Sequence, residues 1–65
     1  MAIAKVIEVI AEGDTVDAAI QAAVAEASKT IRGIKGVYVE GIQALVEDDA
    51  VTAIRVNAKV TFVVS

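Results

Sequence analysis

The sequence predicts an α+β fold with the element order β-α-β-β, in which a curved three-stranded antiparallel sheet wraps around one helix. Three patterns support this prediction. The final stretch alternates between apolar and polar residues, which is typical of a half-buried strand. An alanine-rich stretch in the first half repeats its apolar residues with helical spacing. Between them, an apolar pattern changes parity at Gly41, which indicates a bend in a strand.

Residues 3–11 form the first predicted strand, because they are rich in β-branched side chains. Their alternation is imperfect, since both Val6 and Ile7 are apolar, and so are both Val9 and Ile10. Such a strand is covered on both faces, or on one face with a subunit contact on the other.

The helix is predicted to follow a turn at Glu12 and Gly13, with either Asp14 or Thr15 as its N-cap, and to continue to about residue 32. Its apolar stripe repeats at intervals of three and four residues and comprises Val16, Ala19, Ile20, Ala23, Ala27 and Ile31. Lys29 and Arg32 are expected in its last turn, with Gly33 after it. Alanine gives high helix propensity and little bulk, so the helix can lie close to a sheet.

The second predicted strand covers residues 37–46, after a short corner at residues 34–36. Val37 and Val39 share one parity, whereas Ile42, Ala44 and Val46 have the other. The change at Gly41 predicts a bulge or sharp bend.

An acidic turn at residues 47–50 joins the second strand to a third at residues 51–64, which predicts a hairpin with the first strand at one edge. The even positions from Ile54 to Val64 are apolar and are predicted to face the helix. Fourteen residues of strand span about 46 Å, whereas a compact domain of this length has a radius of gyration of only about 11 Å. The strand must therefore curl around something or reach into a neighbouring subunit.

The composition indicates one domain, residues 1–65, that associates with copies of itself. The chain is 57% hydrophobic and contains no Cys or His, and its mean hydropathy is +0.68. That is more apolar material than one small core can hide, and neither disulfides nor zinc-type sites can stabilise it. The net charge is −3, the Lys and Arg residues are scattered, and the apolar runs are short, which argues against nucleic-acid and membrane partners. The beginning of the chain lacks a signal-peptide pattern, so a cytoplasmic location is expected.

The residues do not favour an enzyme, because no Cys or His can act as nucleophile or base and no hydroxyl has a recognisable activating partner. Glu8 and Glu12 are either paired acids or ordinary surface charges. The acidic run from Glu47 to Asp49 is either a solvated turn or a site for a hard cation such as calcium, to which several copies could contribute. The Gly33–Gly36 stretch follows a helix and so does not have the layout of a phosphate loop.

Arg55 is the most unusual single residue, a bulky cation on the polar side of the last strand. Three roles remain open from the sequence. It is a solvated surface residue, an ion-pair partner across a subunit interface, or a contact for an anion or another ligand.

The chain resembles the dodecin family over residues 5–64. The resemblance rests on the length, the β-α-β-β order and four stretches in register: Lys5-Val6, residues 17–23, Lys29-Thr30-Ile31-Arg32 and Lys59-Val60-Thr61-Phe62. It implies a hollow homododecamer, which would explain both the surplus of apolar residues and the long last strand.

The same resemblance implies a flavin site near a two-fold axis, where a tryptophan stacks on the ring and a glutamine contacts its edge. Gly36 occupies the tryptophan position here, Arg55 the glutamine position, and the chain has no tryptophan. Tyr38, two residues beyond Gly36, is the replacement ring that the sequence offers. The chain is therefore similar to dodecin-like proteins that lack the flavin residues, a branch with which calcium binding is associated.

The expected function is thus a non-enzymatic, dodecameric binding or storage protein that is not loaded with FMN or riboflavin and holds calcium or another small ligand. Two alternatives remain open. One is a flavin-storage protein that uses Tyr38 and Arg55 in unusual roles, and the other is a structural shell without a ligand.

Overall fold

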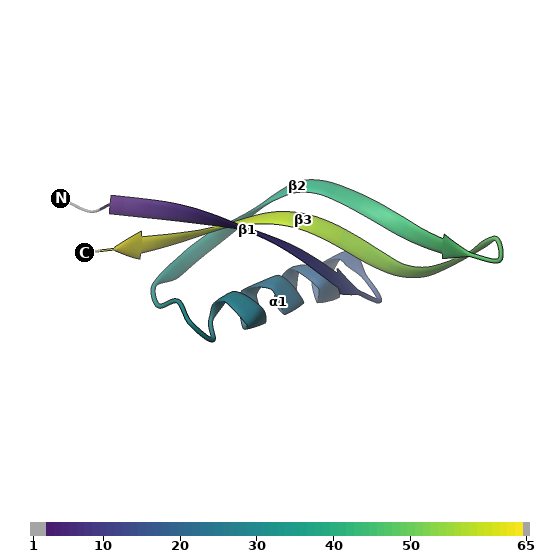
Figure 1. The fold of residues 1–65 in the computed structure, drawn as a ribbon, viewed down its shortest axis with the longest axis horizontal. Helices are drawn as coiled ribbons and strands as arrows, with labels where there is room; N and C mark the ends of the chain where they lie inside the picture. The colour runs from purple at the N-terminus through teal and green to yellow at the C-terminus, as the bar shows by residue number, and fades with distance from the viewer. Residues whose placement is uncertain (1–2, 65) are drawn as a thin grey trace.

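The computed structural model describes residues 3–64, so Met1, Ala2 and Ser65 of the predicted domain lie outside the described residues. The elements follow the predicted order: β1 (Ile3–Gly13), α1 (Val16–Ala27), β2 (Ile34–Glu47) and β3 (Ala50–Val64). The three strands form one antiparallel sheet in the order β1-β3-β2. The sheet bends over the helix, as Figure 1 shows. The predicted fold class is therefore confirmed, and the edge that β1 joins is the β3 side of the hairpin.

Strand β3 is the centre of the sheet, and its even positions form the core. Val56, Ala58 and Val60 are completely buried. They lie against an alanine face of α1 formed by Ala19, Ala23 and Ala27, which are also buried. We call this side of the sheet the inner face and the opposite side, which carries Arg55, Asn57 and Lys59, the outer face. The prediction that the even positions face the helix is confirmed for the buried centre of β3.

The helix begins where the sequence places it but ends earlier than predicted. Thr15, rather than Asp14, is the N-cap, and its Oγ1 accepts a hydrogen bond of 3.1 Å from the backbone N–H of Ala18. The helix ends at Ala27, so Ile31, Lys29 and Arg32 do not belong to it, and the last turn contains no basic residue. Ser28 donates its hydroxyl proton to the carbonyl oxygen of Ala25, a local bond that competes with continued helix.

Strand β2 begins three residues earlier than predicted, so the expected corner at residues 34–36 is part of the strand. The register between β2 and β3 shifts at Ile34/Gly36 and at Val39/Gly41, which leaves Lys35 and Glu40 as extra residues on β2. The second shift confirms the bulge predicted at Gly41. It places Val39 and Ile42 opposite the buried Ala58 and Val56, so both parities of the sequence reach the inner face.

The chain turn itself lies at Gly33, where φ is +80°, a conformation that glycine adopts without a steric cost. The carbonyl oxygen of Gly33 accepts a hydrogen bond from the backbone N–H of Val63. This bond fixes the start of β2 beside the end of β3.

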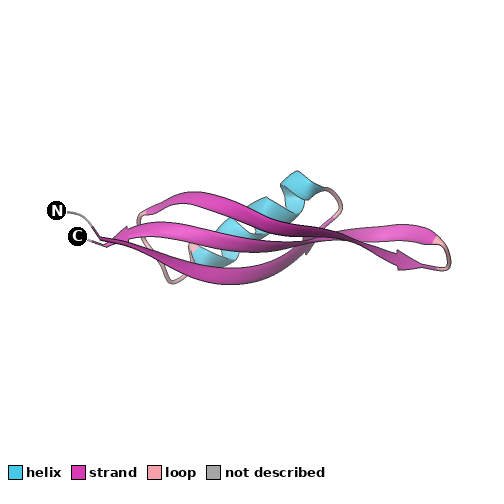
Figure 2. Cartoon of the chain, turned by 90° about the horizontal axis from the view of Figure 1, so that it is seen from above, coloured by secondary structure: helices cyan, strands magenta, loops and turns pink. Residues whose placement is uncertain are grey.

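The hairpin between β2 and β3 extends past both α1 and β1, as seen in Figure 2. Asp48 and Asp49 form its two-residue turn with φ values of 52° and 64°, which is the backbone of a type I′ turn. The described chain measures 51 × 20 × 14 Å and has a radius of gyration of 13.3 Å. It is elongated rather than compact, so the long strand both curls around the helix and projects beyond it. Within residues 3–64, no helix is long and apolar enough to cross a membrane.

Candidate functional site

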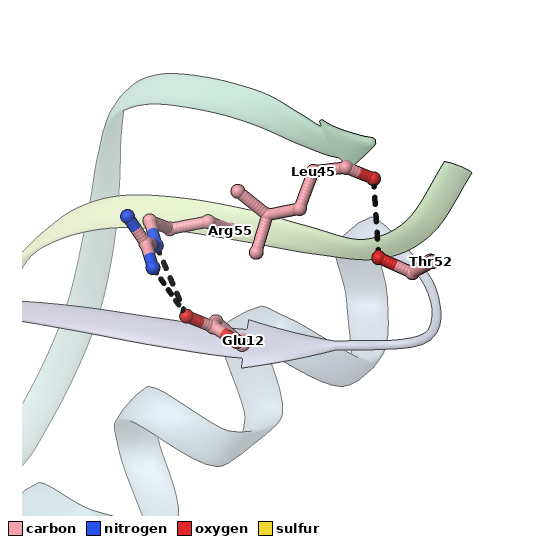
Figure 3. A network of polar contacts seen from close by, with 4 residues as sticks. All are labelled: Glu12, Leu45, Thr52 and Arg55. Atoms are coloured by element: carbon pink, nitrogen blue, oxygen red, sulfur yellow. Dashed lines mark hydrogen bonds and ion pairs between the residues drawn. The ribbon is translucent and has the colours of Figure 1, made fainter. Parts of the chain in front are cut away.

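The outer face of the sheet places Arg55 beside Glu12. The two residues are direct cross-strand partners in the pairing of β1 with β3. The Nη2 and Nε atoms of Arg55 lie 2.7 and 3.1 Å from Oε2 of Glu12, and both donate to it (Figure 3). The side chains are 42% and 48% exposed, which makes this a surface ion pair worth about 0–1 kcal/mol. Arg55 therefore has a partner within its own chain, a role that the sequence reasoning had not considered.

A second polar cluster lies further along the outer face, around Glu40. Nζ of Lys59 is 2.9 Å from Oε2 of Glu40, and Nδ2 of Asn57 donates to Oε1 of the same carboxylate at 3.5 Å. The hydrogen bond and the charge of Glu40 raise the pKa of Lys59 above its usual 10.5. The bulge residue Glu40 thus compensates the charge of Lys59, as Glu12 compensates that of Arg55.

Between these two clusters the outer face has an open depression of about 330 Å³. It is lined by Ile10, Gly41, Ile42, Gln43, Arg55 and Asn57. Its polar side chains are two amides, which donate and accept hydrogen bonds, and a guanidinium, which only donates, and the two isoleucines are its apolar residues. None of the lining side chains is a nucleophile or a general base. The depression therefore offers hydrogen-bonding groups beside apolar side chains.

Gly36, Tyr38 and Arg55 all belong to the outer face, but one chain does not bring them together. Gly36 pairs with Thr61 and Tyr38 with Lys59, whereas Arg55 pairs with Gln43 on β2. At about 3.3 Å per residue along β3, Gly36 is roughly 20 Å from Arg55 and Tyr38 roughly 13 Å. The ring of Tyr38 is 66% exposed, and a Cβ added at Gly36 would meet nothing within 4 Å. Their role in ligand binding stays a prediction.

Sequence reasoning missed Gln43, Asn57 and the partnership of Glu12 with Arg55. Gln43 is opposite Arg55 only because the bulge at Glu40 moves the register of β2 by one residue. The change of apolar parity at Gly41 was the available signal. Beyond it, the even positions of β2 face inward, so the odd position Gln43 lies on the outer face. Glu12 is 43 residues from Arg55 in sequence, so their contact depends on the register between β1 and β3.

The acidic run from Glu47 to Asp49 lies at the tip of the hairpin. Among residues 3–64, no group of three or more acidic, histidine or cysteine side chains is arranged to hold a metal ion. Glu8 does not pair with Glu12 as an acid dyad would, because they lie opposite Lys59 and Arg55 respectively. Calcium binding by several copies stays a prediction.

The curved three-stranded sheet wrapped over a single helix defines the class of fold to which this chain belongs. The model of the dodecin family matches residues 3–65. The chain therefore belongs to the dodecin family. Members of this family are non-enzymatic flavin-binding proteins that typically form homo-oligomers.

The solved structures most similar in fold include the dodecin of Thermus thermophilus. The tt0972 protein of Thermus thermophilus and an arginine-to-alanine variant of the T. thermophilus dodecin each match with a TM-score of 0.92 and 29% sequence identity. The alignments cover 100% of this chain and 97% and 98% of those chains, respectively. A tryptophan-to-phenylalanine variant matches with a TM-score of 0.91 at the same identity. A comparison with curated protein sequences finds no match. Family and fold together support a small binding or storage protein that associates with itself.

Proposed function

We propose that this chain is a non-enzymatic storage protein that assembles into a homododecamer and holds a small polar ligand other than flavin. The observation that carries the proposal is the depression around Arg55, Gln43 and Asn57 on the outer face. It offers hydrogen bonds from two amides and a guanidinium beside the apolar side chain of Ile10.

The exclusion of flavin rests on Gly36 and Arg55. An aromatic pair contributes about 0.5–1.5 kcal/mol beyond the burial of its area, and Gly36 has no ring to contribute. The nearest ring on the same strand face, that of Tyr38, lies opposite Lys59 rather than Thr61. Arg55 places a cation, already bonded to Glu12, where the family resemblance expects an amide.

The first test is the colour and flavin affinity of the protein. We expect wild-type protein purified from cells to be colourless and to leave riboflavin and FMN fluorescence unquenched. A double variant, Gly36→Trp with Arg55→Gln, should bind flavin at least about tenfold more tightly, because the space at Gly36 is open and a stacking ring is gained. Gly36→Ala with Arg55→Gln is the matched control and should not bind. A yellow wild-type preparation would overturn the exclusion of flavin.

The second test identifies the ligand and the assembly. Mass spectrometry of the small molecules released on denaturation should find a polar compound that is lost from a Gln43→Ala, Asn57→Ala variant. A native mass of twelve 6.7-kDa subunits is expected. If no compound is released from freshly purified protein, the storage role is wrong and a shell without a ligand replaces it.

A further inference from the structure

The projecting part of the hairpin, residues 45–53, leaves an apolar surface uncovered. Val46 and Val51 are 63% and 62% exposed. Helix α1 does not reach this part of the hairpin, and β1 ends at Gly13, opposite Ile54, whose partner on β2 is Ala44 (Figure 2). We call residues 45–53 the arm. An exposed apolar surface on a two-stranded element with no covering layer indicates an interaction site.

The arm is also strongly acidic. Glu47, Asp48 and Asp49 lie at its tip, and the sequence between Glu40 and Ile54 contains no Lys or Arg. The two aspartates are held in the turn by backbone with positive φ. The three carboxylates are exposed at the tip, and the arm contains no cation to compensate them.

The opposite end of the molecule has the complementary charge. Four of the six basic residues of the chain gather there: Lys5, Lys29, Arg32 and Lys35. Lys5 lies opposite Phe62, which also pairs with Ile34, the neighbour of Lys35. Lys29 and Arg32 lie in the connection between α1 and β2, which Figure 1 places on the same side as the chain ends. We call this region the basic end.

The basic end is exposed and has little internal compensation. Within residues 3–64, Lys29 is the one basic residue there with an acidic partner, Glu26 at 2.8 Å, and Arg32 donates to the carbonyl oxygen of Ser28. Ile3 and Val64, which pair with each other at this end, are 58% and 41% exposed. Each end of the long axis thus combines uncovered apolar side chains with charge of one sign, and the signs are opposite.

We propose that the arm of one copy docks on the basic end of a second copy, head to tail. The occupant is a copy of this chain because charge and apolar surface match between its own two ends. Docking of arm on arm would instead bring six carboxylates together. A head-to-tail contact uses two different surfaces, so it repeats until the rotation closes a ring. The proposal rests on the self-association in the proposed function and is independent of any ligand.

The test reverses the charge of each end separately and then of both. The arm variant carries Glu47→Lys, Asp48→Asn and Asp49→Asn, since asparagine tolerates positive φ. The basic-end variant carries Lys5→Glu and Lys35→Glu, which leaves Lys29 and Arg32 beside three carboxylates, the two introduced ones and that of Glu26. The combined variant carries all five substitutions. The control adds charge on the exposed helix surface instead, through Gln21→Lys, Ala22→Lys and Ala25→Lys. Native mass spectrometry and light scattering measure assembly at low salt.

We expect each single-end variant to need at least about tenfold more protein for half-assembly than wild type. The combined variant, whose two ends again carry opposite charge, should need less protein than either single-end variant, and the control should assemble as wild type does. Assembly of either single-end variant at the wild-type concentration would overturn the proposal, and so would a combined variant that assembles no better than the single-end variants. A folded circular dichroism spectrum of the combined variant shows that the substitutions are compatible with the fold.

A second measurement covers the case in which a variant does not fold. Wild-type assembly should weaken severalfold between about 0.05 and 1 M salt, because the screening length falls to about 3 Å. Salt-independent assembly would contradict the docking of opposite charges. A wild-type chain that is monomeric throughout would instead refute self-association, and hence the proposed function itself.

Discussion

Replacing Gly13 with alanine should destabilise the protein, because this glycine lies directly under the first turn of α1. A Cβ built on Gly13 would lie 2.6 Å from the backbone nitrogen of Ala19 and 2.8 Å from the carbonyl carbon of Ala18. Both are backbone atoms, which cannot rotate away as the end of a side chain can. The end of β1 and the start of the helix would have to separate.

The size of the effect follows from two opposing contributions. Overpacking a close contact costs about 1–3 kcal/mol, whereas a Gly-to-Ala change at a compatible backbone stabilises by about 0.4–1 kcal/mol through the unfolded chain. The clash is the larger contribution, so the net loss should be about 1–2 kcal/mol. For a chain of this size, that corresponds to a melting temperature lower by about 4–16 °C.

Gly36→Ala is the matched control, because nothing lies within 4 Å of a Cβ at Gly36. The same chemical change should there be neutral or stabilise by up to about 1 kcal/mol. Both variants are unfolded thermally and in urea at one protein concentration, since association makes apparent stability concentration-dependent. Equal unfolding midpoints for the two variants would refute the close approach of β1 to α1.

Three further predictions concern the core, the cap and the outer face. Val60→Ala should lower the free energy of unfolding by about 2 kcal/mol because Val60 is completely buried, and an effect below about 0.5 kcal/mol in urea unfolding would mean that Val60 does not face the core. Thr15→Ala should lower the free energy of unfolding by about 1 kcal/mol and Thr15→Ser should lower it little, because only the hydroxyl accepts the hydrogen bond from Ala18. The loss of helix content on heating measures this difference. Glu40 raises the pKa of Lys59, so the stability that Lys59 contributes is present below the unfolded pKa of 10.5 and lost as pH rises through the higher folded value. A Lys59→Met variant should therefore have a lower free energy of unfolding than wild type in urea at about pH 8, and this difference should shrink as the pH rises. A difference that grows above about pH 11 would contradict this sign.

The sequence predicted the inner face of β3 well because alternation there is strict. Val56, Ala58 and Val60 could face the helix only if Arg55, Asn57 and Lys59 faced away. The bulge in β2 was predictable for a related reason: an apolar pattern that changes parity keeps a common face only if one residue is extra. Glu40 is that residue.

The predicted end of the helix was wrong because the helical spacing of apolar residues continues past Ala27. Ile31 has the correct spacing from Ala27, and no glycine occurs between Ala27 and Gly33. What ends the helix at Ala27 is the hydroxyl bond of Ser28 and the need to bring Gly33 to Val63, where its carbonyl accepts a hydrogen bond. The second requirement depends on residues 30 positions apart, which a helical pattern does not contain.

The charges of this molecule fall into two groups with different consequences. On the outer face, Arg55 and Lys59 are compensated by Glu12 and Glu40 of the same chain. An anionic ligand in the depression would therefore gain from Arg55 only about what it loses to Glu12, which favours an uncharged polar ligand there. At the two ends of the long axis, the ion pairs among residues 3–64 include none for the arm and, for the basic end, that of Lys29 with Glu26. Salt should consequently weaken assembly more than it weakens ligand binding. Opposite behaviour, with salt-sensitive binding and salt-insensitive assembly, would mean that the ion pair of Glu12 and Arg55 opens to receive an anion.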